Sequence, residues 1–290
     1  MILIGEEIQI LSKVVSQAIK ERDPAPLQDI AKRLTEAGAD YIDLNIGPAK
    51  KEPDVMPWLV EVVQEVTDLP LALDTLNPVA MEKGLAVCKK RPLLNSASGR
   101  TDSKNNMMPL AVKYNCDVIL SVLTDQGIPS DAGSSAEAIM ETIDYANSIG
   151  IANESIWVDP IMMPIGVDQP RVVAMIEFFE MLEDIAPGVK STLGLSNMSS
   201  GAPHHLRGIL NRVMMVVLEK FGMYSAIVET FDGELVALAR GQKPADVELI
   251  HRAIDEEINP ADLPPHEAAI VKTVNVVTGK NLYSHSWLEI

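Results

Sequence analysis

Four polar side chains stand where apolar, strand-length runs of the sequence end. Asp74 closes the run in LALDTLN, Asn95 the run in LLNSASG and Asp159 the run in IWVDP. Asn197 follows the run in LGLSNMSS. A carboxylate only accepts hydrogen bonds, whereas an amide both donates and accepts them. Together these residues suit a neutral ring with mixed N–H and N edges better than they suit a phosphate.

Each of these residues also has a purely structural interpretation. Asp74 could cap the helix that follows it, and an asparagine at a strand end could close an Asx turn. Capping is less attractive for Asp159, because Pro160 has no amide hydrogen to donate. We therefore favour ligand contact for Asp159 and leave both interpretations open for the other three residues.

The spacing of the apolar runs predicts the fold that would bring these residues together. Such runs alternate with amphipathic helices at intervals of about 25 to 35 residues, which is typical of an α/β fold with parallel strands, the (β/α)8 or TIM barrel. The predicted strands cover residues 1–8, 41–46, 70–73, 92–95, 117–123, 155–159, 192–196 and 226–229. Catalytic groups of TIM barrels lie at the carboxyl ends of the strands, and we call that end of the barrel the mouth.

One segment departs from the alternation of strands and helices. Between about residues 240 and 265 the sequence is polar, acidic and rich in proline. We interpret it as an insertion beside the barrel, before a last helix at about 268–278. Residues 1–290 are then expected to form a single domain, because a chain of 290 residues with 47% apolar content fills one barrel of ordinary size.

The overall composition excludes several classes of partner. A net charge of −17 and a pI near 4.7 argue against nucleic acid and anionic membranes, because like charges repel. Cys88 and Cys116 match neither a disulfide framework nor a thiolate zinc site, so we expect reduced core thiols. The sequence lacks a basic leader and any run of about 18 apolar residues, which predicts a soluble cytoplasmic protein.

Other groups of charged or ligating side chains are weaker candidates. His204–His205 are adjacent, and neighbours in sequence seldom converge on one metal ion, so we expect loop residues and no metal site. The pair Glu6–Glu7 is interpreted as a solvated face. Asp43 and Asn45, in the run DLNIG, could line the mouth, although Asp43 could equally bind backbone inside the barrel.

The motifs at the strand ends, taken together, resemble those of the pterin-binding methyltransferases. The matching stretches, in chain order, are GEEIQ, DLNIGPA, LALDTLN, LLNSAS, WVDPIMMP and LGLSNMS. The sequence is similar to the methyltetrahydrofolate:corrinoid/iron–sulfur protein methyltransferases and to the folate-binding module of cobalamin-dependent methionine synthases. The resemblance covers about residues 1–240 and resumes in the last helix.

This resemblance implies an activity and the residues that carry it. The N5 methyl group of methyltetrahydrofolate would pass to the Co(I) of a corrinoid (cobalamin) on a separate protein, or back again, so this chain needs no metal ligands of its own. Asn197 is the implied catalytic residue, placed near N5. The implied substrate-binding residues are Asp74, Asn95, Asp159, Arg207 and Asn45.

The resemblance also bears on the glutamate tail of the substrate and on assembly. An anionic tail needs local cations in so acidic a protein, and the candidates near the expected mouth are Lys50, Lys51, Arg100, Lys104 and Arg207. A homodimer is common in the resembling family, and the apolar face of the predicted helix at 207–221 is a candidate surface for it.

Departures from the family pattern keep alternatives open. The family's GERIN-type opening is GEEIQ here, so Glu7 stands where a cation is common, and the segment at 240–265 has no counterpart. A relative that uses tetrahydromethanopterin is one alternative. A second is a dihydropteroate synthase, which would need a lysine on strand seven near the mouth. A third is a non-catalytic pterin-binding scaffold for a corrinoid protein.

Overall fold

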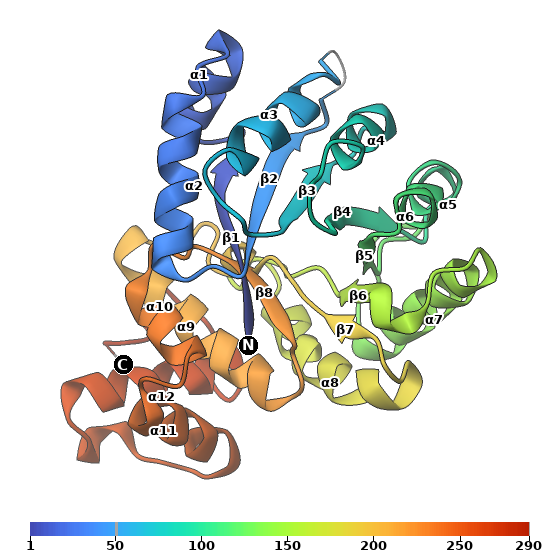
Figure 1. The fold of residues 1–290 in the computed structure, drawn as a ribbon. Coiled ribbons are helices and arrows are strands. Elements are labelled where there is room, and N and C mark those ends of the chain that lie inside the picture. The colour runs from blue at the N-terminus through green and yellow to red at the C-terminus, as the bar shows by residue number, and fades with distance from the viewer. Residues whose placement is uncertain (50–51, 290) are drawn as a thin grey trace.

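Eight parallel strands form the centre of the fold in a computed structural model that describes residues 1–49 and 52–289 (Figure 1). They are β1 (Ile2–Gln9), β2 (Tyr41–Gly47), β3 (Leu71–Thr75), β4 (Leu93–Ser98), β5 (Asp117–Ser121), β6 (Ile156–Asp159), β7 (Lys190–Ser191) and β8 (Ser225–Val228). Their order in the sheet is β7-β6-β5-β4-β3-β2-β1-β8. A bridge between Gly194 and Ile227 joins its two ends, and the Ile227 amide donates to the Leu193 carbonyl at 2.9 Å. The predicted TIM barrel is confirmed.

Helices connect the strands and surround the barrel (Figure 1). They are α1 (Lys13–Glu21), α2 (Ala25–Ala37), α3 (Val55–Gln64), α4 (Pro78–Leu85), α5 (Thr101–Asn106), α6 (Met108–Tyr114), α7 (Ala132–Ser148), α8 (Gln169–Ile185), α9 (His204–Lys220), α10 (Gly233–Ala239), α11 (Pro244–Asp255) and α12 (Pro265–Val277). Three 3-10 turns are η1 (Asn153–Ser155), η2 (Leu195–Asn197) and η3 (Pro260–Asp262). Local signals set several boundaries: Asn77 caps α4 by accepting from the Val79 amide, and Gly38 ends α2 with a φ of 93°.

The prediction for strand seven is wrong. We expected a strand at 192–196, but β7 ends at Ser191 and residues 195–197 form the turn η2. The apolar spacing of LGL imitates a strand, whereas Gly194 pairs with β8 and Ser196 and Asn197 favour a turn. Asn197 therefore projects from a turn rather than from the end of a strand.

The segment at 240–265 holds an ordered helix. Its helix α11 buries Leu249, Ile250 and Ala253, and it packs on α9 and α12. The apolar face of α9 is also covered within this chain, since Leu210, Val213 and Met214 are buried. That face is consequently unavailable as the dimer surface that we considered, and a homodimer stays a prediction.

The interior of the barrel is filled toward the amino ends of the strands. Ile4, Ala72, Leu93, Ile119 and Trp157 form a buried cluster separate from the larger core between sheet and helices. The Trp157 ring makes edge contacts to two tyrosine rings, with centroid distances of 5.6 and 5.4 Å, and its indole N–H donates to Asp117 at 3.1 Å. The packed end leaves the mouth as the open end of the barrel.

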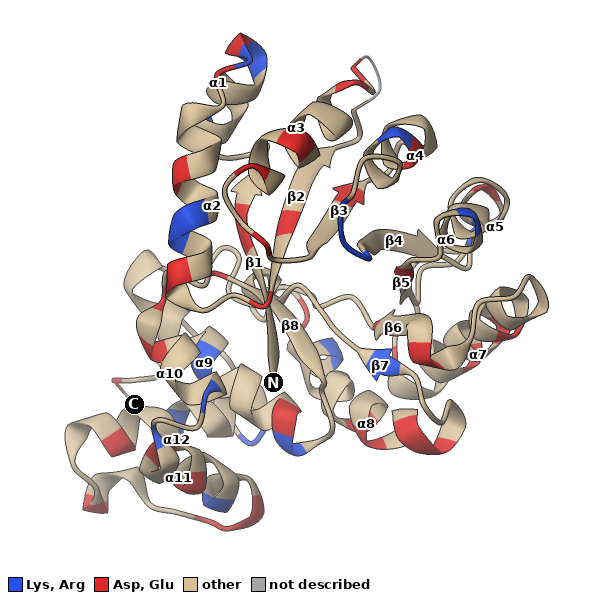
Figure 2. Cartoon of the chain, viewed as in Figure 1, with Lys and Arg blue, Asp and Glu red and all other residues tan. Residues whose placement is uncertain are grey.

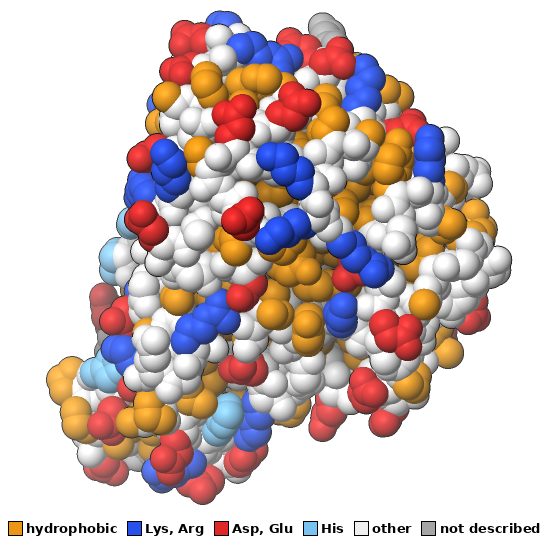
Figure 3. Space-filling model, in the orientation of Figure 1, with side chains coloured by type: hydrophobic (Ala, Val, Ile, Leu, Met, Phe, Trp, Pro, Cys, Tyr) orange, Lys and Arg blue, Asp and Glu red, His pale blue; other side chains and the backbone are white. Residues whose placement is uncertain are grey.

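Charge is distributed unevenly over the protein. Acidic residues occur on most helices and also on β2 and β3, inside the ring of helices (Figure 2). On the face drawn in Figure 3, hydrophobic side chains gather toward the middle and Lys and Arg side chains stand around them. Within residues 1–49 and 52–289, no helix is long and apolar enough to cross a membrane.

The filled end of the barrel predicts a stability effect. Trp157→Ala should lower the free energy of unfolding by about 3–5 kcal/mol, because it empties a fully packed site. Urea unfolding measures the loss. Trp58→Ala removes the same ring from a half-buried position on α3 and should cost clearly less. Equal losses in the two variants would contradict the role given to the cluster.

Candidate active site

Strand register places three polar side chains in a row at the mouth. Asn45 of β2 is level with Asp74 of β3, and Asp74 is level with Asn95 of β4. Asp159 ends β6, level with Ser121 of β5. Because all eight strands are parallel, their carboxyl ends share one end of the barrel. The strand-end residues Asp74, Asn95 and Asp159 are therefore brought together as the sequence predicts.

Asp74 is held by Asn45. The Asn45 Nδ2 donates to Asp74 Oδ2, while Asn45 Oδ1 accepts from the backbone N–H of Gly47 at 3.0 Å. The contact to Gly47 fixes which end of the carboxamide faces Asp74. One oxygen of the Asp74 carboxyl is thereby oriented, and the other is left for a ligand.

Asn95 is held in the same way by Asp43. Asn95 Nδ2 donates to Asp43 Oδ1 at 2.9 Å, and the two residues are only 8% and 3% exposed. Sequence reasoning left Asp43 between lining the mouth and binding backbone, and its partner is this side chain. Since one N–H of the Asn95 amide is engaged by Asp43, its carbonyl oxygen keeps a defined direction.

Burial raises the pKa of the carboxyl groups at the mouth. Burial, followed by repulsion from Asp159, raises the pKa of Asp74 to about 7. Burial raises the pKa of Asp159 to about 6, although the Ile161 N–H, which donates to it at 2.8 Å, acts in the opposite direction. Burial and the Asp74 charge raise the pKa of Asp43 well above its usual range. Near neutral pH the mouth can hold protons on these carboxyls.

Asn197 lies on the turn η2, and its side chain is exposed. A Cβ added at Gly194 would lie 2.9 Å from Asn197 Nδ2, so the carboxamide rests directly over the Gly194 backbone. Any larger residue at 194 would push the amide away. The position of Asn197 thus depends on the path of the chain between β7 and α9.

Arg207 lies in the first turn of α9. Its Nε donates to Ser199 Oγ at 3.1 Å, and its charge lowers the pKa of Glu6, which places it near that carboxyl. Arg207 lines two adjoining clefts of about 640 and 550 Å³ beside the ends of β1 and β8. His204–His205 line the larger cleft. The structure gives Arg207 a partner in the loop after Asn197.

The interpretation of Glu6–Glu7 as a solvated face is wrong. Burial raises the pKa of Glu6 to about 7, and Ser196 Oγ donates to it at 2.6 Å. Glu7 Oε1 accepts from Thr230 Oγ1 and from the Phe231 amide, each at 3.0 Å. Both residues lie within β1, a strand paired on both sides, so neither carboxyl is free in solvent. Glu7, which replaces a family cation, ties β1 to the loop after β8.

The cations considered for an anionic tail are partly engaged. Lys50–Lys51 lie outside the described residues. Arg100 pairs with Asp102 at 3.1 Å, and the Lys104 Nζ lies 5.5 Å from the centroid of the Tyr145 ring. Arg100 also lines a cavity of about 260 Å³ where β4 and β5 end. It is therefore the described member of this set, besides Arg207, that adjoins a cavity beside the mouth.

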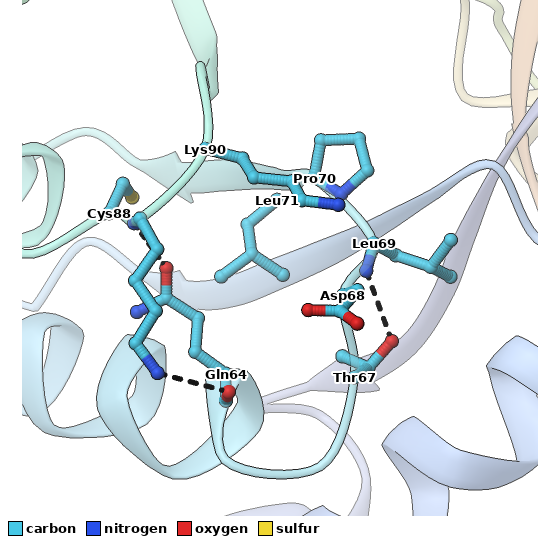
Figure 4. Close-up of a pocket in the computed structure, with 9 residues that line it drawn as sticks. Gln64, Thr67, Asp68, Leu69, Pro70, Leu71, Cys88 and Lys90 are labelled. Carbon is cyan, nitrogen blue, oxygen red and sulfur yellow. Dashed lines mark hydrogen bonds between the residues drawn. The ribbon is translucent and has the colours of Figure 1, made fainter.

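A pocket at the opposite end of the barrel is not part of this site. It is lined by residues 64, 67–71 and 88–90 (Figure 4) and has a volume of about 60 Å³. Leu71 begins β3, whereas Asp74 lies near its carboxyl end. A volume of this size holds only about two water molecules.

The described residues contain no group of three or more His, Cys, Asp or Glu side chains placed to hold a metal ion. Cys88 and Cys116 are free, and burial raises the pKa of each thiol to about 12. Both thiols therefore stay protonated near neutral pH.

Comparison with known proteins agrees with the resemblance seen in the motifs. A family described as pterin binding enzymes matches residues 12–229. A methylcorrinoid:tetrahydrofolate methyltransferase of Eubacterium limosum is 30% identical over 232 residues, which are 79% of this chain and 85% of that protein. A methionine synthase of Mycobacterium leprae is 27% identical over 240 residues, which span 79% of this chain but only 20% of that much longer protein.

Among solved structures, a dihydropteroate synthase of Stenotrophomonas maltophilia superimposes with a TM-score of 0.65. The match covers 84% of this chain and 92% of that chain at 15% identity. At so low an identity the likeness concerns the fold alone.

The raised pKa of Asp74 predicts a pH-dependent cost in stability. A carboxyl with a higher pKa in the folded than in the unfolded protein holds more protons when folded, so stability falls as the pH rises from about 4 to about 7. Asp74→Asn cannot ionise. It should be more stable than the original protein by about 1–3 kcal/mol at pH 8, and the gain should shrink toward zero near pH 4.

Urea unfolding at pH 4, 6 and 8 measures this gain. Asp29→Asn, which neutralises an exposed carboxyl on α2, is the matched control and should change stability by less than about 0.5 kcal/mol at any of these pH values. Absence of a gain at pH 8 would contradict the raised pKa.

Proposed function

This chain belongs to the pterin-binding enzymes, and we propose that it is a methyltransferase that moves the N5 methyl group of methyltetrahydrofolate, or of a related pterin, to or from the Co(I) of a corrinoid on a separate protein. The observation that carries the proposal is the mouth in which Asp74, Asn95 and Asp159 meet. The similarity to the methylcorrinoid:tetrahydrofolate methyltransferase, which extends over most of both chains, supports the reaction.

The mouth has the hydrogen-bonding groups that a pterin ring needs. The ring presents N–H donors beside ring nitrogens and a carbonyl, and carboxylates and amides are complementary to such an edge. Asn45 orients Asp74 and Asp43 orients Asn95, so these groups are held before a ligand arrives. Preorganised partners of this kind bind a ring in one orientation.

Asn197 is proposed to act where the methyl group leaves. The C–N5 bond breaks as Co(I) attacks the methyl carbon, its electron pair stays on N5, and N5 must take up a proton because an amine anion is a poor leaving group. A carboxamide whose hydrogen bond to N5 strengthens as this charge develops binds the transition state better than the substrate. The exposed position of Asn197 at the mouth suits a group that meets both reactants.

The alternative of a dihydropteroate synthase finds less support. That reaction requires a lysine of strand seven at the mouth, whereas Lys190 begins β7 at the opposite end of the barrel. Its ammonium lies 3.4 Å from Asp117 and 5.2 Å from the Trp157 ring centroid. We also propose a corrinoid protein as the partner and a cytoplasmic location, and a homodimer remains part of the proposal.

Calorimetric titration with methyltetrahydrofolate tests the pterin site. We expect binding in about the micromolar range for the original protein and at least about tenfold weaker binding for Asp74→Asn and for Asp159→Asn, because each loses a carboxylate acceptor. Asp29→Asn should bind like the original protein. Absence of binding to the original protein would point to a different pterin.

Asn197→Ala tests the transition-state role. Removal of the carboxamide should slow methyl transfer to a corrinoid acceptor on the order of 10²-fold, while the affinity for methyltetrahydrofolate changes no more than a few-fold. Single-turnover kinetics and calorimetry measure the two quantities separately. Equal losses of affinity and rate would mean that Asn197 only binds the ring.

A further inference from the structure

The turn that carries Asn197 is held by a side chain from the start of the chain. Ser196 Oγ donates to Glu6 Oε1 at 2.6 Å, across a sequence separation of 190 residues. Glu6 belongs to β1, whose backbone is fixed by pairing with β2 and β8. A hydrogen bond to an ionised acceptor is roughly twice as strong as a neutral one. Glu6 thus connects a rigid strand to the residue next to Asn197.

Further bonds continue from Ser196 into the same loop. Ser199 Oγ donates to the Ser196 carbonyl at 3.2 Å, and Arg207 Nε donates to Ser199 Oγ at 3.1 Å. On the other side of the turn, the Ile165 amide donates to the Met198 carbonyl at 2.9 Å. The loop is therefore supported from β1, from α9 and from the segment after β6.

A carboxyl at position 6 is unfavourable for stability alone. Burial, together with repulsion by Glu7 and Glu229, raises the pKa of Glu6 to about 7, and only the Ser196 bond and the Arg207 charge oppose the increase. An apolar residue would avoid this cost at a buried position. None of the ring contacts proposed above uses Glu6, so its role lies in what it holds.

We infer that Glu6 is a positioning residue for Asn197, because its bond to Ser196 fixes η2 and with it the carboxamide relative to the bound ring. The inference rests on the proposed methyl transfer. The Asn197 carboxamide lies against Gly194 without spare room, so a shift of the turn shifts the amide. Misplacement of a catalytic group by about 1 Å can slow a reaction on the order of 10²-fold.

Four single variants test the connection. Ser196→Ala and Glu6→Ala should each lower the rate of methyl transfer at least about tenfold, while the affinity for methyltetrahydrofolate changes less than about threefold. Glu6→Gln keeps an oxygen that can accept from Ser196 and should recover most of the rate lost in Glu6→Ala. Ser200→Ala makes the matched change at an exposed position of the same loop and should leave the rate unchanged. Thermal unfolding checks that each variant is folded.

A double variant separates positioning from an independent role. In an Asn197→Ala background, Ser196→Ala should slow transfer less than about twofold, because its effect passes through the missing carboxamide. Three results would overturn the inference: an unchanged rate in Ser196→Ala, a full further loss in the Asn197→Ala background, or a parallel loss of pterin affinity. In each of these cases the original protein still binds pterin and transfers methyl. If the original protein does neither, the proposed function fails and the inference fails with it.

Discussion

The crowding of carboxyl groups at one poorly hydrated end of the barrel is the constraint on which the rest of the site depends. Parallel strands deliver their carboxyl-end side chains to one place, so Asp43 and Asp74 sit together and Asp159 raises the pKa of Asp74. Isolated charges are costly there. The structure answers with amide partners, Asn45 and Asn95, and with protons held near neutral pH. These partners also give the acceptor groups fixed directions.

The arrangement separates the parts of the protein that stabilise it from the parts that react. The apolar cluster around Trp157 and the larger core between sheet and helices hold the barrel together. The opposite end carries groups whose pKa values are moved in the direction that weakens the folded state. Destabilising groups persist where function requires them and other interactions compensate. A ring with several N–H groups would satisfy the same carboxyls that are unfavourable without it.

The sequence predicted what is determined locally and missed what depends on distant segments. Asp74, Asn95 and Asp159 were predictable because each strand end is marked by an apolar run followed by a polar residue. The burial of Glu6 was not, since it follows from β8 and the η2 loop, which pack against β1 from the far end of the chain. The run LGL resembled a strand until Gly194 paired with Ile227. Helix α11 did carry a local signal, because Leu249, Ile250 and Ala253 follow helical spacing.

The filled amino end of the barrel leaves a single route to Asp74. A small ring and a bulky protein-bound cobalt centre that both reach this site must use the same opening, so a docked protein blocks the passage of the ring. The order of events then follows from geometry: the ring enters before the protein docks, and the demethylated or remethylated ring leaves only after the protein has departed. Exchange of the two partners, and not the bond-breaking step alone, would therefore limit how often the site can be reused.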